Sequence, residues 1–147
     1  MERTLVLIKP DAVERNQIGE VIHHLESHGL KVIALKMVFL EEGEGAGFYQ
    51  VHKGKPFYEN LIRFIASGPL VAMVLEGEEA ISRTRTIMGV TDPAQAEEGS
   101  IRRKLGTSVV KNAVHGSDST TSATTEISFF FSQREILSES EVKARKG

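Results

Sequence analysis

The sequence contains no cysteine among its 147 residues. A disulfide framework, a thiolate nucleophile and a zinc–thiolate site are therefore all excluded. The sequence also lacks an apolar run long enough to span a membrane, and the apolar part of the opening segment MERTLVLIKP is too short for the core of a signal peptide. A formal net charge of −2 gives no reason to expect a nucleic-acid-binding surface. We therefore expect a soluble, cytoplasmic protein with no membrane or nucleic-acid partner.

Several motifs of nucleotide-binding and hydrolytic proteins are absent as well. No GxxxxGK[ST] segment is present, which excludes a Walker-type phosphate loop in that form, and the glycine-rich segment 43–47 does not continue as a dinucleotide fingerprint requires. No serine stands in the strand–GxSxG–helix context of a hydrolase. His24 and His28 are four residues apart, but Glu26 is not at the position of an HExxH motif. An exposed helix face is therefore favoured there over a metal site.

What is present is the composition of an ordinary globular protein, with 40% apolar and 26% charged residues. The length suits one domain with its own core. The run from Thr4 to Ile8 is continuously apolar and predicts a central strand buried on both faces. Further strands are expected at 31–40, which would lie at a sheet edge, at 70–75 and immediately before His115.

Helical patterns alternate with these strands. Helices are expected at 18–25, from Pro56 through Ile65, at 78–88 and after residue 118 or 119, with a short helical piece at 49–52. A polar turn is expected after Pro10, a loop at the glycines of 43–47, and a long irregular loop at 89–111, a length that is usually functional. The order β-α-β-(α)-β-α-β with a C-terminal helix predicts a ferredoxin-like α/β sandwich of the α+β type, in which helices cover a four-stranded antiparallel sheet. We expect this domain to span residues 1–137 and a polar, loosely held tail to follow at 138–147.

The stretch NAVHGSDSTTSATTEISFFF, residues 112–131, holds the residues best suited to chemistry. A strand end presents His115, and an amphipathic helix follows with Asp118 or Ser119 as its N-cap. Glu126 lies about two helical turns after Ser119 and so falls on the face of the helix start. An imidazole, a hydroxyl and a carboxylate thus converge where backbone N–H groups favour an anion, a layout typical of a histidine nucleophile for phosphate. The alternatives are a structural histidine and a solvated Ser/Thr-rich linker.

Groups able to hold a polyphosphate are spread along the chain. If His115 accepts a phosphoryl group, positive charges must stabilise the transferred group. The candidates are Lys9 at a strand end, Arg85 late in a helix, Thr91 and Arg102 in the long loop, and Asn112, which could bond a sugar hydroxyl. Phe57 and Tyr49 could contact a base. Taken singly, such charged residues are more commonly solvent-exposed and such aromatic residues more commonly part of a core.

Taken together, the motifs resemble those of nucleoside diphosphate kinases. They are KPDAV at 9–13, SGP at 67–69 with VLEG at 74–77, TDPA at 91–94, SIR at 100–102, and N-x-x-HGSDS at 112–119 followed by Glu126. They stand in the order and spacing of that family over nearly the whole chain. The resemblance implies a ping-pong transfer of the γ-phosphoryl group of a nucleoside triphosphate, typically ATP, to a nucleoside diphosphate through a phosphohistidine, with broad tolerance of base and sugar.

The resemblance also implies roles for individual residues. His115 would be the nucleophile, with Ser117 and Glu126 holding its ring and Tyr49 nearby. The nucleotide would be bound at the phosphates and the ribose 3′-hydroxyl by Lys9, at the ribose by Asn112, at the phosphates by Arg85, Thr91 and Arg102, and at the base by stacking on Phe57. Mg²⁺ would be carried mainly by the nucleotide phosphates with no protein ligand, in keeping with the absence of a carboxylate cluster in the sequence.

One departure from the family pattern follows Arg102. Relatives commonly continue with a small residue, an Asp and an aromatic residue, whereas this chain has Arg103, Lys104 and Leu105. The difference puts the packing of the loop and the subunit contacts in question. The resemblance implies a homo-oligomer, a tetramer or hexamer built from dimers, with 31–40 as the dimer strand.

Two other functions are open to a chain of this kind. The first is a non-catalytic nucleotide-binding regulatory module on the same scaffold, which would lack the nucleophile or a phosphate ligand. The second is a histidine phosphotransfer protein of the signalling type, which usually exposes its histidine on a helix of a bundle. Neither matches a sequence that retains the nucleophile and every phosphate ligand of the family pattern and brings His115 to a strand end.

Overall fold

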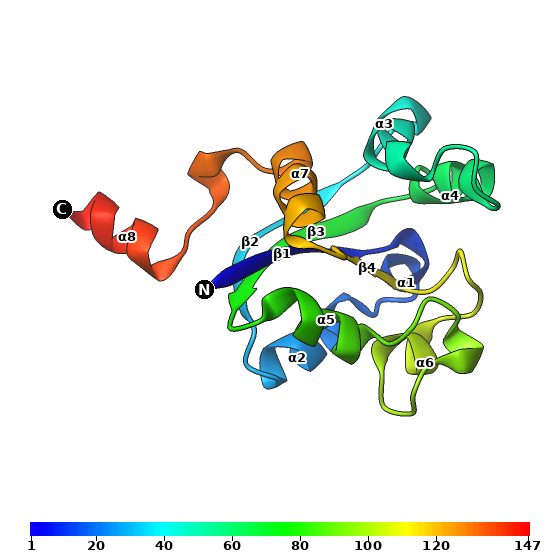
Figure 1. The fold of residues 1–147 in the computed structure, drawn as a ribbon, viewed down its shortest axis with the longest axis horizontal. Helices are drawn as coiled ribbons and strands as arrows, with labels where there is room; N and C mark the ends of the chain where they lie inside the picture. The colour runs from blue at the N-terminus through cyan, green and yellow to red at the C-terminus, as the bar shows by residue number, and fades with distance from the viewer.

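The computed structural model describes all 147 residues. Its four strands form one antiparallel sheet in the order β2-β3-β1-β4. The strands are β1 (Glu2–Ile8), β2 (Lys31–Val38), β3 (Leu70–Gly77) and the short β4 (Val114–Gly116). The predicted ferredoxin-like sheet is confirmed, and β2 lies at the predicted edge (Figure 1).

Strand β1 divides the core into two parts. Val6 and Ile8 point into a cluster with the helices of one face, while Leu5 and Leu7 point into a second cluster on the opposite face. All four side chains are fully buried. The continuous apolar run therefore is, as predicted, a central strand covered on both sides, because successive side chains of a strand point to opposite faces.

Helices cover both faces of the sheet (Figure 1). The first face carries α1 (Pro10–Glu14), α2 (Ile18–Ser27), α5 (Ala80–Met88) and α6 (Ile101–Leu105), which contribute to the first cluster. The second carries α3 (Glu42–Phe48), α4 (Tyr58–Ile65) and α7 (Thr120–Phe130). Short 3₁₀ turns lie at η1 (Gln50–His52), η2 (Pro93–Gln95) and η3 (Gln133–Glu135), and α8 (Glu139–Lys146) ends the chain. No helix combines the length and the apolar character needed to cross a membrane.

The prediction of a loop at 43–47 was wrong, because this segment forms α3. The Glu44 carboxylate accepts a hydrogen bond from the Glu41 N–H at 2.9 Å and so satisfies a donor at the start of the helix. Gly45 is buried where α3 meets α4, and a Cβ atom on it would stand only 2.8 Å from Cγ2 of Ile65. Glycine here permits close packing of two helices, a tertiary reason that a glycine-rich sequence does not reveal.

Three other boundaries differ from the predictions. The segment after Pro10 is the short helix α1 and not a polar turn, and the long loop at 89–111 contains η2 and α6. The helix expected from Pro56 begins instead at Tyr58, because Phe57 has a φ of 70° and cannot belong to a right-handed helix. In each case local backbone geometry, fixed by tertiary contacts, decides the boundary.

The tail forms helix α8, although no helix was predicted there, and none of its residues is buried. Its acidic first turn and basic last turn favour a helix. Arg145 is paired with Glu141 at 3.0 Å and donates to the backbone oxygen of Arg134 at 2.9 Å.

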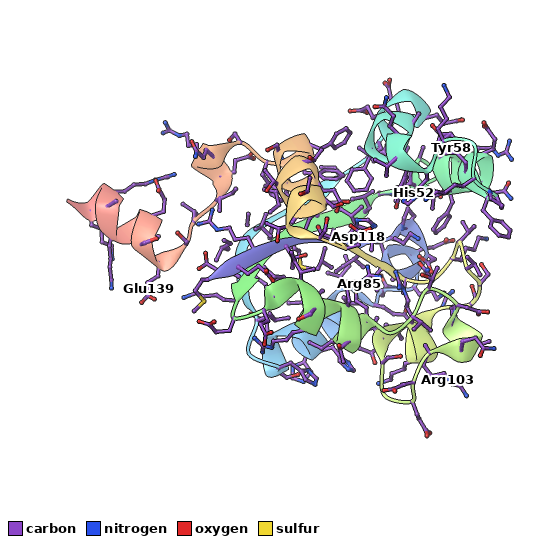
Figure 2. The ribbon with its side chains drawn as sticks, viewed as in Figure 1. His52, Tyr58, Arg85, Arg103, Asp118 and Glu139 are labelled. Carbon is purple, nitrogen blue, oxygen red and sulfur yellow. The ribbon has the colours of Figure 1, made fainter.

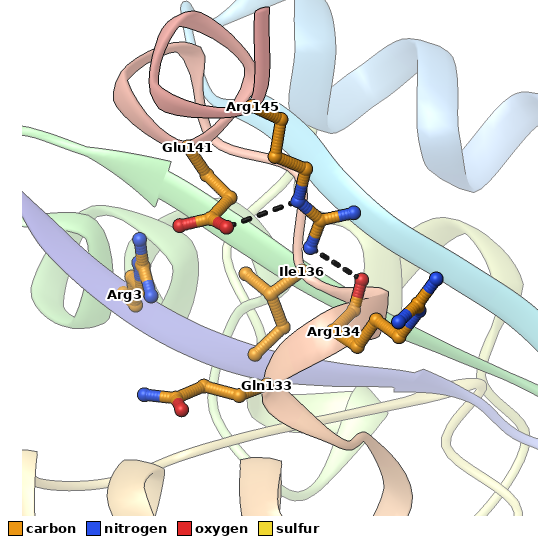
Figure 3. Close-up of a pocket in the computed structure, with 6 residues that line it drawn as sticks. All are labelled: Arg3, Gln133, Arg134, Ile136, Glu141 and Arg145. Carbon is orange, nitrogen blue, oxygen red and sulfur yellow. Dashed lines mark hydrogen bonds and ion pairs between the residues drawn. The ribbon is translucent and has the colours of Figure 1, made fainter. Parts of the chain in front are cut away.

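Between this tail and the start of β1 lies a hollow of about 780 Å³, which we call the tail hollow (Figure 3). Its walls are formed by Arg3, Gln133, Arg134, Ile136, Glu141 and Arg145.

Candidate active site

Strand β4 carries His115 to the edge of the sheet, where it pairs with Leu7 of β1. The Nε2 atom of His115 lies 2.9 Å from Oε1 of Glu126, and the Ser117 hydroxyl donates to the same oxygen at 2.8 Å. Both His115 and Glu126 are largely buried, with side chains 17% exposed. Ser117 is itself fixed, since its Oγ accepts a hydrogen bond from the Leu5 N–H at 3.2 Å. Ser117 thus orients the carboxylate and reaches the imidazole ring only through it.

The start of helix α7 after Ser119 places Glu126 beside His115. Ser119 is the N-cap and accepts a hydrogen bond from the Ser122 N–H at 3.1 Å, which confirms one of the two N-cap candidates. Asp118 stands just outside the helix and faces the same space as Arg85 (Figure 2). Hydrogen bonds from Ser122 and Ser119 and the charge of Arg85 lower the pKa of Asp118.

Aromatic rings pack against the imidazole of His115. The ring of Phe48 meets it edge-on with 5.2 Å between centroids, and the ring of Tyr49 does so at 6.0 Å. Tyr49 is buried, and its hydroxyl has no hydrogen-bond partner in the protein. Burial and then the charge of Glu126 raise the pKa of Tyr49. An unpartnered buried hydroxyl beside the histidine leaves one donor free for a ligand.

Two buried cations stand on the other side of the site. Lys9, 4% exposed, donates from Nζ to Oδ1 of Asn112 at 2.8 Å and to the backbone oxygen of Val110 at 3.0 Å. Burial and the nearby charge of Arg102 lower the pKa of Lys9 to about 7, against the opposing effect of Asp11.

Arg102 is held by backbone oxygens and by no carboxylate. It donates to the backbone oxygens of Gly89 and Val114, each at 2.9 Å, and its Nε has no partner. Burial and then the charge of Arg85 lower the pKa of Arg102 to about 10. Buried cations that lack counter-ions favour the entry of an anion.

One cleft of about 300 Å³, which we call the histidine cleft, brings nine of the ten predicted site residues together. They come from the residue after β1, the segment between α3 and α4, α5, the 89–112 segment, β4 and α7: Lys9, Tyr49, Phe57, Arg85, Thr91, Arg102, Asn112, His115 and Glu126. Ser117 does not line the cleft and lies behind Glu126.

Sequence reasoning missed several residues of the histidine cleft. His52 lies three residues after Tyr49, with their ring centroids 5.9 Å apart, and this helical spacing was the available signal (Figure 2). Burial, followed by the charges of Lys55 and His115, lowers the pKa of His52. Val109 lines the same cleft as Phe57, and both side chains are exposed. An exposed valine in a polar loop was the signal in that case.

The departure after Arg102 leaves the loop well packed. Leu105 is buried in the first core cluster. Arg103 donates to the backbone oxygen of Ala94 at 2.9 Å, and Lys104 pairs with Glu20 of α2 at 2.7 Å. Arg103 points away from the sheet at the outer side of α6 (Figure 2). Arg103, Lys104 and Leu105 therefore hold the loop in place through contacts that do not involve the Asp and aromatic residue of the relatives.

His24 of α2 and His28, directly after this helix, are engaged with backbone oxygens. Nε2 of His24 lies 3.0 Å from the backbone oxygen of Gly99, and Nδ1 of His28 lies 2.7 Å from that of His24. The structure brings together no group of three or more His, Cys, Asp or Glu side chains that could hold a metal ion.

The fold and the histidine cleft together define a ferredoxin-like protein with a cationic, histidine-containing site suited to a phosphorylated ligand. The family model for nucleoside diphosphate kinase matches residues 2–136. The nucleoside diphosphate kinase of Persephonella marina is 56% identical over 137 residues, which cover 93% of this chain and 98% of that protein. The chain therefore belongs to the nucleoside diphosphate kinase family, a family of phosphotransferases.

Solved structures agree with this assignment. The crystal structure of the Aquifex aeolicus nucleoside diphosphate kinase superposes with a TM-score of 0.91 at 45% identity, covering 92% of this chain and 99% of that one. The Halobacterium salinarum nucleoside diphosphate kinase in complex with CDP gives a TM-score of 0.90 at 40% identity, covering 93% and 91%.

Proposed function

We propose that this chain transfers the γ-phosphoryl group of a nucleoside triphosphate, typically ATP, to a nucleoside diphosphate through a phosphohistidine on His115. The observation that carries this proposal is the His115–Glu126 pair, 2.9 Å apart, in a cleft with buried cations. A histidine paired with a carboxylate through one nitrogen has its tautomer fixed, with the lone pair on the other nitrogen. The expected nucleophile is therefore Nδ1.

The transfer has two halves that mirror each other. The Nδ1 lone pair attacks the γ-phosphorus, the bond to the bridging oxygen breaks, and the nucleoside diphosphate leaves with that electron pair. A terminal oxygen of a second diphosphate then attacks the phosphohistidine and restores the neutral ring. Glu126 stabilises the positive charge that the imidazole acquires while it carries the group. One site serves both halves, so the kinetics are ping-pong.

Phosphate and sugar binding follow from the polar side chains of the cleft. Arg85, Arg102 and Thr91 would bind the phosphates, because guanidinium groups and hydroxyls donate directly to phosphate oxygens. Lys9 and Asn112 are already 2.8 Å apart and would share the ribose 3′-hydroxyl, with Lys9 also contacting a phosphate. These cations would stabilise the negative charge that develops on the transferred phosphoryl group.

The base would be held by apolar contact and not by hydrogen bonds. Phe57 is 57% exposed although its aromatic ring is large, and Val109 lines the same cleft. A base stacked on Phe57 and touched by Val109 is recognised through its π-face, which every base has. Broad tolerance of bases is the expected result.

Mg²⁺ fits this cleft as an ion carried by the nucleotide. Glu126 and Asp118 are the carboxylates of the cleft, and Glu126 already serves His115 and Ser117. Asp118 already accepts hydrogen bonds from Ser122 and Ser119, and its remaining lone pairs could accept hydrogen bonds from water on the ion, which would not require a protein cage. When bound, the ion neutralises charge on the β- and γ-phosphates.

We also propose a homo-oligomer built from dimers that pair along β2. Leu35 and Met37 of this edge strand and the following Phe39 are exposed apolar side chains, which a monomer rarely gathers at a sheet edge. Sedimentation velocity distinguishes a monomer from a tetramer or hexamer. Leu35→Lys should shift the assembly toward smaller species; an unchanged sedimentation coefficient contradicts the role of β2.

The cellular location is a separate expectation. We expect the chain to act in the cytoplasm, and fractionation of cells that express it tests this.

Labelling with γ-labelled ATP tests the function directly. The purified chain should acquire a label that is acid-labile and alkali-stable, and a chase with GDP should move the label to GTP. The matched control is His28→Gln, since His28 is an exposed histidine directly after α2, outside the cleft. A label that never forms indicates a non-catalytic nucleotide-binding module, and a label that does not move to GDP indicates a phosphotransfer protein of another kind.

A further inference from the structure

Ala113 lies between Asn112 and the strand that carries His115, and its backbone is strained. Its φ is 72°, although it is an alanine, and the Val114 N–H donates to the Asn112 oxygen at 2.8 Å. A hydrogen bond from residue i+2 to residue i around a positive φ marks the rarer form of the γ-turn, which residues other than glycine seldom adopt. Such strain persists only where the surroundings impose it.

The segment directly after β1 holds both backbone groups of Ala113. The Lys9 N–H donates to the Ala113 oxygen at 2.8 Å, and the Ala113 N–H donates to Oδ2 of Asp11 at 3.0 Å. Asp11 is 5% exposed and Ala113 is fully buried. The Asp11 side chain is thus the only side chain that bonds the strained residue.

Stability alone does not explain a carboxylate at this position. Oδ1 of Asp11 is buried and has no hydrogen-bond partner. A neutral acceptor would satisfy the Ala113 N–H without the cost of burying a charge. The charge does, however, act on Lys9, since Asp11 raises the pKa of that side chain against burial and Arg102.

We propose that Asp11 is a positioning residue of the phosphoryl-transfer site, which clamps the strained turn at Ala113 and thereby sets the places of Asn112 and His115. The clamp also puts a negative charge beside Lys9. Asp11 does not line the histidine cleft and so acts through these residues. This role rests on the function proposed above for Lys9, Asn112 and His115.

The first experiment separates the clamp from general folding. Asp11→Ala should lower kcat by about 100-fold, because a displacement of about 1 Å at the reacting groups has an effect of that size. Ala113→Gly alone should keep kcat close to that of the unchanged chain, since glycine adopts a positive φ freely. The double variant Asp11→Ala/Ala113→Gly should recover about tenfold of the lost kcat, because the turn no longer needs the clamp. Glu14→Gln, an exposed carboxylate of the same helix, is the control and should change nothing.

Asp11→Asn separates the hydrogen bond from the charge. It keeps an oxygen that accepts from the Ala113 N–H, so kcat on the acid side of the pH profile should stay within about threefold of the unchanged chain. The lost carboxylate no longer raises the pKa of Lys9, so the alkaline limb of kcat/KM should move to lower pH. The groups that face Lys9 are Asp11 from α1 and Arg102 from α6, and only the first is altered.

Several results would overturn the proposal. They are a kcat for Asp11→Ala equal to that of the unchanged chain, a double variant no more active than Asp11→Ala, and an alkaline limb that does not move in Asp11→Asn. If circular dichroism shows that Asp11→Ala is unfolded, the double variant and Asp11→Asn decide the question by the same criteria. A failure of the unchanged chain to form phosphohistidine contradicts the proposed function, whereas normal labelling with an unaffected Asp11 series contradicts only this role.

Discussion

The two ends of β1 each meet a hollow lined by cations, and the two hollows differ in the state of those cations. The tail hollow, about 780 Å³, is larger than the histidine cleft, about 300 Å³. Two of its arginines are already neutralised. Arg3 is paired with Glu76 at 3.0 Å, and Arg145 is paired with Glu141 at 3.0 Å (Figure 3). In the histidine cleft Lys9 and Arg102 are buried and form no ion pair. Desolvated charge without an ion-pair partner distinguishes a binding site more reliably than volume does.

The largest difference between the two hollows should come from the nucleophile. His115→Ala should lower phosphoryl transfer by about 10⁴-fold or more, since loss of a nucleophile removes the covalent route altogether. Nucleotide binding, followed by calorimetry with ADP, should persist because the phosphate and base contacts remain. Arg134→Ala in the tail hollow serves as the control and should leave transfer unchanged. Retained turnover in His115→Ala would remove that residue from its role.

A smaller effect should follow from removing one cation from each hollow. Arg85→Ala deletes an exposed guanidinium that makes no hydrogen bond within the protein, so folding should be little affected. Loss of a charge-assisted bond to phosphate costs about 1.5–3 kcal/mol, so KM should rise by about 10- to 100-fold. Equal effects of Arg85→Ala and Arg134→Ala on KM would erase the distinction between the two hollows.

The protonation state of Lys9 gives a third and smaller difference between the histidine cleft and the tail hollow. Its pKa of about 7 in the free protein means that the side chain is largely neutral at about pH 8.5. Anionic phosphates raise the pKa of a nearby amine, so ADP binding should take up close to one proton at that pH and almost none well below pH 7. Arg102, with a pKa of about 10, is already charged there and contributes little.

Calorimetry in buffers of different ionisation enthalpy measures this uptake. The slope of the observed enthalpy against the buffer enthalpy gives the number of protons taken up. Lys9→Met should abolish the slope at alkaline pH. A slope near zero for the unchanged chain at about pH 8.5 would mean that Lys9 is already protonated before the nucleotide binds.

The sequence predicted the elements whose signal is local and missed those that depend on contacts between distant residues. Periodicity was enough for β1 and for the face of α7 that carries Glu126, because those patterns are local. The glycines at 43–47 were misread because the reason for Gly45 is Ile65 on another helix. The charged tail was predicted only as a loosely held segment, since its helix buries nothing and so has no apolar stripe to reveal it.

The candidate site also holds both residues that motifs identify and residues that only the fold reveals. The family resemblance pointed to ten residues, and the fold brings nine of them into one cleft. The motifs could not reveal the bond from the Ala113 N–H to Asp11, which joins residues far apart in the chain. Nor could they reveal that Val109 shares a cleft with Phe57, because that depends on how the loop before β4 folds. Motifs identify side chains that touch a ligand better than those that hold other residues in position.

The smallest effect should come from the tail hollow itself. Arg145→Ala removes an exposed i,i+4 pair with Glu141 and a bond to the Arg134 oxygen. Exposed pairs of this kind contribute about 0.3–0.5 kcal/mol, so amide exchange within α8 should quicken by about twofold. The Tm of the domain should not change, because α8 buries no residue and opens without disturbing either core cluster. A fall in Tm of several degrees, or a loss of transfer activity, would show that the tail hollow supports the fold or the reaction, and that exposed, already paired arginines matter as much here as buried ones.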